Sequence, residues 1–205
     1  CSALGAEDAG QGNTAVGTNA LITQDGGDNN TAVGLSAGAD ITTGDNNTLI
    51  GQNAGHSGSN NLTTGSNNII IGKDAAASAA DVSNEITLGN SSISAIRAQV
   101  TSISSLSDKR DKKDIKDSTY GLDFVDSLKP VTFEWDQRDG NRSGVKDVGF
   151  IAQDLQEVDD EYTRLVYESN PDKLEATYGR LIPIMAKAIQ ELSAEVKELK
   201  KQING

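Results

Sequence analysis

The sequence predicts a trimeric α+β molecule built from two different parts. Residues 1–90 are expected to form an intertwined stalk of stacked β repeats, similar to a β-roll or β-helix. Residues 107–205 are expected to form a small α+β domain that ends in a long helix, and residues 91–106 a neck between the two parts. Three observations support this division: a short motif that occurs five times, a sharp change in composition, and a near-heptad pattern at the end of the chain.

Composition separates the two parts. Residues 1–106 contain 15 of the 21 glycines and no aromatic residue, and the first aromatic residue is Tyr120. A segment of this length without Phe, Tyr or Trp cannot fill an ordinary globular core. It must therefore be disordered, or bury small side chains in a regular structure.

Five repeats favour the regular structure. Their glycines follow one another at intervals of 17, 17, 21 and 17 residues, and a branched apolar residue precedes each glycine. A β-branched residue two positions earlier gives the period-two alternation of a short strand with one face turned inward. The Asn/Asp/Gly clusters between the motifs predict turns, and a small residue three positions after each glycine allows close packing of coils. The five motifs are Asn13–Gly17, Asn30–Gly34, Asn47–Gly51, Asn68–Gly72 and Glu85–Gly89.

One such coil cannot bury its own strand, so we expect the coils to stack and the chains to trimerise. The pattern resembles the head repeats of trimeric autotransporter adhesins and repeats of many phage tail fibres. A disordered Gly/Asn-rich linker is the alternative, but a linker has no reason to keep apolar residues in register.

The neck and the C-terminal helix carry apolar residues at helical spacing. In the neck, Ser, Thr, Val and Ile predominate, which favours an extended, intertwined stalk over a helix. From about Tyr178, apolar residues at steps of 4, 3, 4, 4, 3 and 4 predict a helix suited to a three-stranded coiled coil, with packing against its own domain as the alternative. The neck residues are Ile93, Ile96, Val100, Ile103 and Leu106, and those of the helix are Leu181, Met185, Ala188, Leu192, Val196, Leu199 and Ile203.

Charge and composition exclude several functions. The net charge is −12, and residues 1–106 contain nine acidic and two basic residues, which argues against binding to nucleic acid or anionic membranes. No apolar run approaches membrane-spanning length, and no signal-peptide pattern opens the chain, which begins at Cys1 and is expected to be a fragment of a longer protein. A single Cys and a single His, His56, exclude an internal disulfide and multi-histidine metal sites, so we expect no cofactor and no metal.

Four motifs in the second part occur in one order. They are Ser-Asp-x-Arg-x-Lys over 107–112, Leu-Lys-Pro-Val-x-Phe-x-Trp over 128–135, Gly-Phe-Ile-Ala-Gln over 149–153, and Tyr-Gly-Arg-Leu-Ile-Pro over 178–183, which leads into Ala-Ile-Gln-Glu-Leu over 188–192. In this order they resemble the intramolecular chaperone domains of phage tailspikes and tail fibres, peptidase family S74. The family also includes a membrane-anchored animal transcription factor, a branch disfavoured here because residues 1–106 carry no basic patch.

The resemblance implies a domain that trimerises, holds three chains in register while the stalk folds, and then cleaves itself off in a single turnover. It implies Ser107 as nucleophile, Lys112 as general base and cleavage between Leu106 and Ser107, with Asp108 and Arg110 as supporting residues. Serine needs an adjacent base, and lysine serves as one only in its neutral form, which burial favours. Lys112 lies five residues after Ser107, so a turn must bring the two side chains together.

The expected setting is a virion, as part of a tail fibre or spike, with the chaperone domain released in the host cytoplasm. The expected partners are two further copies of the chain and a host-cell surface receptor, bound through the stalk or through parts upstream of it. The alternative is a trimeric adhesin whose C-terminal domain is a permanent cap with an inactive Ser-Lys pair.

Overall fold

The computed structural model describes residues 3–5, 10–58, 60–100, 102–138, 140 and 142–204. The chain divides into two compact units, Cys1–Ile96 with Gln137–Arg142, and Arg97–Asp136 with Ser143–Gly205. Cys1, on which the prediction about disulfides rests, lies outside the described residues. In the described part of the chain, no helix is both long and apolar enough to cross a bilayer.

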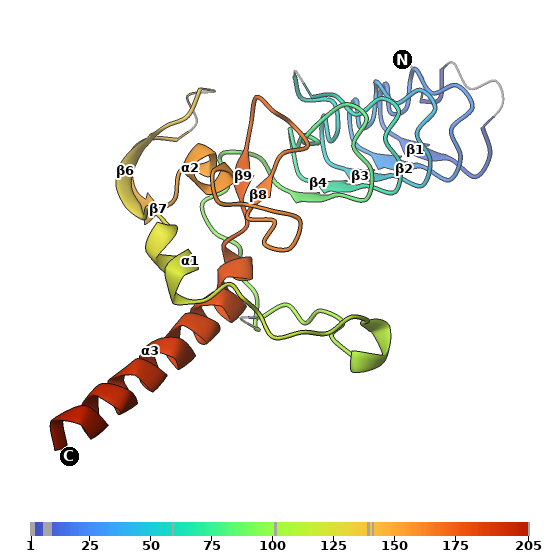
Figure 1. Cartoon of the computed structure of the whole chain (residues 1–205). Coiled ribbons are helices and arrows are strands. Elements are labelled where there is room, and N and C mark those ends of the chain that lie inside the picture. The colour runs from blue at the N-terminus through green and yellow to red at the C-terminus, as the bar shows by residue number, and fades with distance from the viewer. Residues whose placement is uncertain are drawn as a thin grey trace. The chain divides into compact units, whose positions relative to one another are not determined.

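The first unit is a β-solenoid. Five three-residue strands form one parallel sheet in sequence order, and the chain makes one coil between each strand and the next (Figure 1). Equivalent repeat positions pair directly, for example Val16 with Val33 and Val33 with Ile50. The repeat stalk predicted from the sequence is therefore confirmed as a fold. The strands are β1 (Thr14–Val16), β2 (Thr31–Val33), β3 (Thr48–Ile50), β4 (Ile69–Ile71) and β5 (Ile86–Leu88).

The interior of the solenoid is filled by the middle residue of the strands, by small residues from the turns, and by Leu21, Ile41 and Leu62, which also lie between strands. Ala32, Leu49 and Ile70 are buried at the middle positions of β2, β3 and β4. The small residues three positions after the first four repeat glycines belong to this core, because an alanine there lets adjacent coils approach closely, whereas Ser92 in the fifth repeat is exposed. The four alanines are Ala20, Ala37, Ala54 and Ala75, all buried.

The opposite side of the sheet is exposed and apolar. The residue before each repeat glycine points outward, with exposed fractions from 37% at Val33 to 57% at Val16. Because the register is direct, these side chains form one continuous stripe along the sheet. We call this stripe the outer face; it consists of Val16, Val33, Ile50, Ile71 and Leu88.

A ladder of asparagines runs through the solenoid just before the strands. Asn30, Asn47 and Asn68 are buried, and each side-chain oxygen accepts a hydrogen bond from the backbone N–H of the equivalent residue one coil later. Each side-chain amide also donates to a backbone carbonyl, for example Asn47 Nδ2 to Gly65 O at 2.9 Å. The ladder pairs buried backbone groups that the short strands leave unpaired, which explains why asparagine opens four of the five motifs.

The repeat glycines are required by both conformation and space. Gly34 has φ of 140°, in a region that side chains avoid, and a Cβ at this position would overlap the backbone of Gly51 in the next coil. The close stacking of coils therefore depends on these positions having no side chain.

The second unit combines a β-hairpin, short helices and one long helix. In chain order it contains the 3₁₀ turn η1 (Lys109–Asp111), α1 (Leu122–Ser127), β6 (Val131–Asp136), β7 (Ser143–Gly149), α2 (Ala152–Gln156), β8 (Val166–Tyr167), β9 (Glu175–Ala176), the 3₁₀ turn η2 (Tyr178–Arg180) and α3 (Leu181–Asn204). β6 and β7 pair antiparallel, as do β8 and β9. Leu155, Leu165, Val166, Leu181 and Ile184 form the core.

Helix α3 has two apolar faces. Leu181, Ile184 and Ala188 are buried against its own unit, whereas a second set of apolar side chains is exposed. The prediction placed Leu181 and Ala188 in the seam suited to a coiled coil, but both are buried against their own unit, as the alternative of packing against its own domain expects. Residues on both faces are spaced by three and four positions, so spacing alone does not separate the two faces. The exposed seam, which we call the α3 seam, consists of Ile182, Met185, Ile189, Leu192, Val196, Leu199 and Ile203 and steps strictly by 3, 4, 3, 4, 3 and 4.

The neck forms neither helix nor strand over its described residues, 91–100 and 102–106. Its apolar side chains are exposed, with Ile103 fully exposed and Leu106 80% exposed. The absence of a helix in these residues agrees with the preference for an extended neck over a helical one, and the intertwining of chains stays a prediction.

Candidate functional site

The turn η1 brings Ser107 and Lys112 together. Asp108 precedes the turn, and its carboxylate accepts a hydrogen bond from the backbone N–H of Arg110 at 2.9 Å. The backbone N–H of Lys112 donates to the carbonyl of Lys109 at 3.2 Å, after which the chain returns to an extended conformation. The turn that the five-residue spacing requires is therefore present between the two residues.

Lys112 Nζ donates a hydrogen bond to Ser107 Oγ at 2.6 Å. This distance is within the range in which a base and a nucleophilic hydroxyl exchange a proton. If the ammonium loses its proton, the same two atoms are placed for the hydroxyl to donate to the amine. Leu106, whose carbonyl precedes Ser107, has an exposed side chain.

Both residues of the pair are exposed in the single chain, as are all described residues from Lys109 to Thr119. In the described part of the chain no ion pair joins Lys112 to the flanking acids Asp111 and Asp114, and a carboxylate close to the amine would favour its protonated form. The site therefore has the geometry of a Ser-Lys pair without the dry environment that the chemistry needs.

Asp108 and Arg110 form the charged pair nearest to these two residues. Arg110 Nη2 lies 2.7 Å from Asp108 Oδ2, and Arg110 Nε lies 3.0 Å from Asp108 Oδ1. The hydrogen bond from the Arg110 side chain, and then the one from its backbone N–H, hold the pKa of Asp108 below its usual range. Asp108 therefore stays ionised throughout the neutral range.

The chain that follows the turn is anchored at residues 120–122. Tyr120 donates its hydroxyl hydrogen to Asp160 Oδ2 at 2.5 Å, and this hydrogen bond is the main reason that the pKa of Tyr120 rises to about 12. The backbone N–H of Leu122 donates to Glu191 Oε2 of α3 at 2.7 Å. Gly121 leaves room for this carboxylate, because a Cβ there would overlap it.

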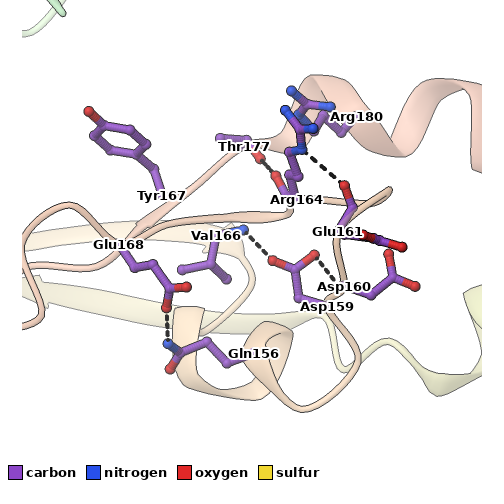
Figure 2. Close-up of a pocket in the computed structure, with 10 residues that line it drawn as sticks. All are labelled: Gln156, Asp159, Asp160, Glu161, Arg164, Val166, Tyr167, Glu168, Thr177 and Arg180. Carbon is purple, nitrogen blue, oxygen red and sulfur yellow. Dashed lines mark hydrogen bonds between the residues drawn. The ribbon is translucent and has the colours of Figure 1, made fainter. Parts of the chain in front are cut away.

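The loop between α2 and β8 lines part of a polar pocket in the same unit. Figure 2 shows its lining, in which acidic and arginine side chains lie close together. Asp159 accepts hydrogen bonds from Thr163 Oγ1 at 2.5 Å, from the backbone N–H of Leu165 at 2.7 Å and from that of Val166 at 3.0 Å. The lining residues are Gln156, Asp159, Asp160, Glu161, Arg164, Val166, Tyr167, Glu168, Thr177 and Arg180.

The hydrogen bonds of Asp159 indicate a structural role. Burial raises the pKa of this carboxyl, but the hydrogen bonds from Thr163, Leu165 and Val166 outweigh burial, and the net shift is downward. The carboxylate is thus occupied in holding the loop, as is Asp160, which accepts from the backbone N–H groups of Tyr162 and Thr163. Among the described residues, no group of three or more His, Cys, Asp or Glu side chains is arranged to hold a metal ion.

The structure joins the four charged or nucleophilic residues named from the sequence in two pairs, Ser107 with Lys112 and Asp108 with Arg110. Sequence reasoning missed Asp159, Asp160 and Glu191. The adjacent acids at 159 and 160, followed by Thr163, have the composition of a side-chain-stabilised turn and were a usable signal for the first two. Nothing near Glu191 in the sequence indicates its contact with Leu122, which lies 69 residues earlier.

Comparison with known proteins gives one match. Residues 107–166 match the model of the peptidase S74 family, described as chaperone of endosialidase. No curated protein and no solved structure matches the chain. The match begins at Ser107 and includes the turn, the hairpin and α2, and the family implies a self-cleaving peptidase at a coarse level. Residues 107–166 are therefore similar to the chaperone-of-endosialidase family, and the match supports an intramolecular chaperone domain after the β-solenoid.

Proposed function

We propose that this chain is the C-terminal part of a viral tail fibre or spike. Its domain at 107–205 drives trimerisation and folding of the β-solenoid, and then removes itself by cleavage between Leu106 and Ser107. The observation that carries the proposal is the contact of Lys112 Nζ with Ser107 Oγ at the first residues of the family match. The solenoid stays in the virion, where it or parts upstream of it contact a host-surface receptor, and the domain is released in the host cytoplasm.

Two exposed apolar surfaces support trimerisation. The outer face runs along the whole solenoid, and the α3 seam runs along the whole of the long helix. Contiguous apolar surface of this extent is rare on monomeric proteins and is typical of interfaces. A strict alternation of three- and four-residue steps is the pattern of a left-handed coiled coil, so the α3 seam suits association with the same helix of other chains.

Desolvation on assembly would activate the Ser-Lys pair. In the single chain water surrounds both side chains, and water favours the ammonium form of lysine. Burial between chains favours the neutral amine, which can then accept the serine proton. Cleavage would therefore follow correct assembly rather than precede it.

The proposed reaction proceeds through an ester. Ser107 Oγ attacks the carbonyl carbon of Leu106 through a five-membered ring while its proton passes to Lys112 Nζ. The C–N bond then breaks, the Ser107 amine takes up a proton, and Leu106 is left esterified to Ser107 Oγ. Water hydrolyses the ester, which gives a carboxylate on Leu106 and a free amino group on Ser107.

Intact mass spectrometry of freshly expressed protein tests the proposal. Wild-type protein should give two species, residues 1–106 and 107–205, in place of one species of 21.5 kDa. Ser107→Ala and Lys112→Ala should each give the uncut chain and still trimerise, and Lys113→Ala, the neighbouring lysine, should be cut normally. A released domain that begins with Asp108 would contradict the assigned bond, and normal cleavage of Lys112→Ala would contradict the assigned base.

The adhesin alternative is favoured by one observation, the full exposure of the Ser-Lys pair in the single chain. It predicts a stable trimer of uncut wild-type chains under every condition in which the domain is folded. The same mass spectrum distinguishes the two functions when it is combined with light scattering to measure trimer content.

A further inference from the structure

The charged pair in the turn has no part in the proposed chemistry, yet its geometry is specific. We propose that Asp108 and Arg110 are positioning residues that keep η1 closed, so that each chain assembles its own Ser107–Lys112 pair. This inference rests on the proposed function, because it assigns how the cleaving pair is held. It adds that the pair is completed within one chain and before assembly.

The backbone of the turn alone provides few restraints. Asp111 N–H donates to Asp108 O, and Lys112 N–H to Lys109 O, each at 3.2 Å, near the long end for such bonds. A three-residue 3₁₀ turn of this kind is marginal in water, since it fixes several dihedral angles for two weak bonds. Side-chain bonds are therefore needed to keep Lys112 beside Ser107.

Asp108 supplies these bonds from both of its oxygens. Oδ1 accepts the backbone N–H and Nε of Arg110, and Oδ2 accepts Nη2. One carboxylate thus caps the turn and fixes the side chain that extends from its middle. A charge-assisted pair with two parallel bonds fixes orientation better than a single contact. The arginine side chain itself is 88% exposed and pairs with Asp108. We therefore assign it the role of restraining the Asp108 carboxylate.

The closed turn makes the cleaving pair local. Ser107 and Lys112 belong to the same six-residue segment, and their contact of 2.6 Å needs no other chain. Other chains are then needed only to exclude water from a pair that already exists. Asp108 and Arg110 carry opposite charges, so the turn is closed without a net charge added beside Lys112.

A double-mutant cycle tests the positioning role. Asp108→Ala should lower the cleavage rate about tenfold through loss of the cap, and Arg110→Ala about threefold through loss of an exposed ion pair. The double variant should match Asp108→Ala, because Arg110 acts through Asp108. Asp108→Asn keeps an acceptor for the Arg110 N–H and should recover part of the rate, and Lys109→Ala should cleave like wild type.

Light scattering on the same substitutions in the Ser107→Ala background provides the folding control. Trimer content should be unchanged in every case, so that a slower cut reports the turn and not the fold. Cleavage of Asp108→Ala at the wild-type rate would overturn the inference, as would fully additive effects of the two substitutions. An uncut wild-type protein would instead overturn the proposed function.

Mixed trimers test whether the pair forms within one chain. Ser107→Ala and Lys112→Ala chains with different tags are co-expressed, and trimers that carry both tags are isolated. Because each chain lacks one member of its own pair, no chain in these trimers should be cut. Cleavage of the Lys112→Ala chain, which retains Ser107, would show that lysine acts on a neighbouring chain, and the inference would fail while self-cleavage remained.

Discussion

At the scale of single residues, the carboxylate of Asp159 holds the loop between α2 and β8 in place. It accepts hydrogen bonds from the backbone N–H groups of Leu165 and Val166, which lead into β8. Asp160 next to it accepts the hydroxyl of Tyr120 and so connects the same loop with the chain that comes from the turn. The loop therefore links the core strand to the segment that carries the Ser-Lys pair.

Asp159→Ala should lower the unfolding free energy of the second unit by about 2 kcal/mol at neutral pH, because two buried N–H groups lose their acceptor. Since folding lowers the pKa of Asp159, its contribution is complete above the unfolded value of about 4 and is lost as the pH falls through the lower folded value. The difference between wild type and variant should therefore shrink below about pH 4. Trp135, the only tryptophan, reports unfolding of this unit by fluorescence in the uncut Ser107→Ala background.

Glu161→Ala is the matched control for Asp159→Ala, since it removes an acid from the same loop whose side chain forms no described hydrogen bond. Its unfolding curve should match that of the parent protein at every pH. A difference between Asp159→Ala and the parent that stays constant down to pH 2 would show that the carboxylate charge does not stabilise the loop.

Residue roles differ in how far the sequence could predict them. The contact between Ser107 and Lys112 was predictable from a motif, because both residues and the turn between them lie in one six-residue segment. The motif asparagines were visible in the repeats, but their bonds run to the next coil, so the buried ladder required the fold. Glu191 depends on a contact across the domain that no local pattern encodes.

At the scale of the elements, α3 has a buried first part and an exposed apolar seam. Its first two turns bury Leu181, Ile184 and Ala188 in the core of the second unit. Beyond Ala188 no residue of the helix is buried over its described length, and the part after Glu191 extends away from the rest of its unit (Figure 1). A long amphipathic helix with a free apolar seam is marginal in water unless another helix covers the seam.

Leu192→Asp should therefore prevent trimerisation, because it places a charge in the middle of the α3 seam. Cleavage should be lost together with the trimer, since the proposed pair becomes active only when assembly excludes water from it. Ala194→Asp adds the same charge two residues later, on the opposite side of the helix, and should leave both unchanged. Light scattering and intact mass measure the two outcomes, and a cut but monomeric Leu192→Asp would separate cleavage from assembly.

Repeats made the elements of the solenoid predictable, whereas α3 shows the limit of periodicity. The five strands lie within the five motifs, because the spacing of glycines and β-branched residues leaves one arrangement that closes a coil. In α3 two apolar stripes overlap, and a single sequence pattern cannot assign Leu181 to one of them. Only the position of the neighbouring core decides between the stripes.

At the scale of the whole molecule, we expect the solenoid and the chaperone domain to fold by different routes. The solenoid is a parallel sheet whose strands are 17 or more residues apart, so its contacts are non-local and its assembly is expected to be slow. The exposed outer face would be free to associate wrongly during this time. A domain that brings three chains together first shortens the search.

After cleavage the solenoid should be held by its unfolding barrier rather than by equilibrium. We predict that the cut 1–106 trimer resists denaturation but does not re-form after it, because the domain that started its assembly has left. Uncut Ser107→Ala protein should recover at least part of its trimer. Both are denatured and diluted, and light scattering measures the recovery. Equal recovery would contradict the role of the domain in assembly.

The uniformity of the repeats has one more consequence. If one chain slid along its neighbour by a single coil, four of the five strands would still meet an equivalent strand, with similar apolar side chains in contact. A periodic surface therefore defines which faces of neighbouring chains come into contact, but not which coil of one chain lies against which coil of the next. The coil between β3 and β4 is longer than the others, and within it His56 Nδ1 contacts Asp40 Oδ2 at 2.6 Å. This longer coil interrupts an otherwise periodic array. The longer coils of neighbouring chains therefore lie side by side only when no chain is shifted along another.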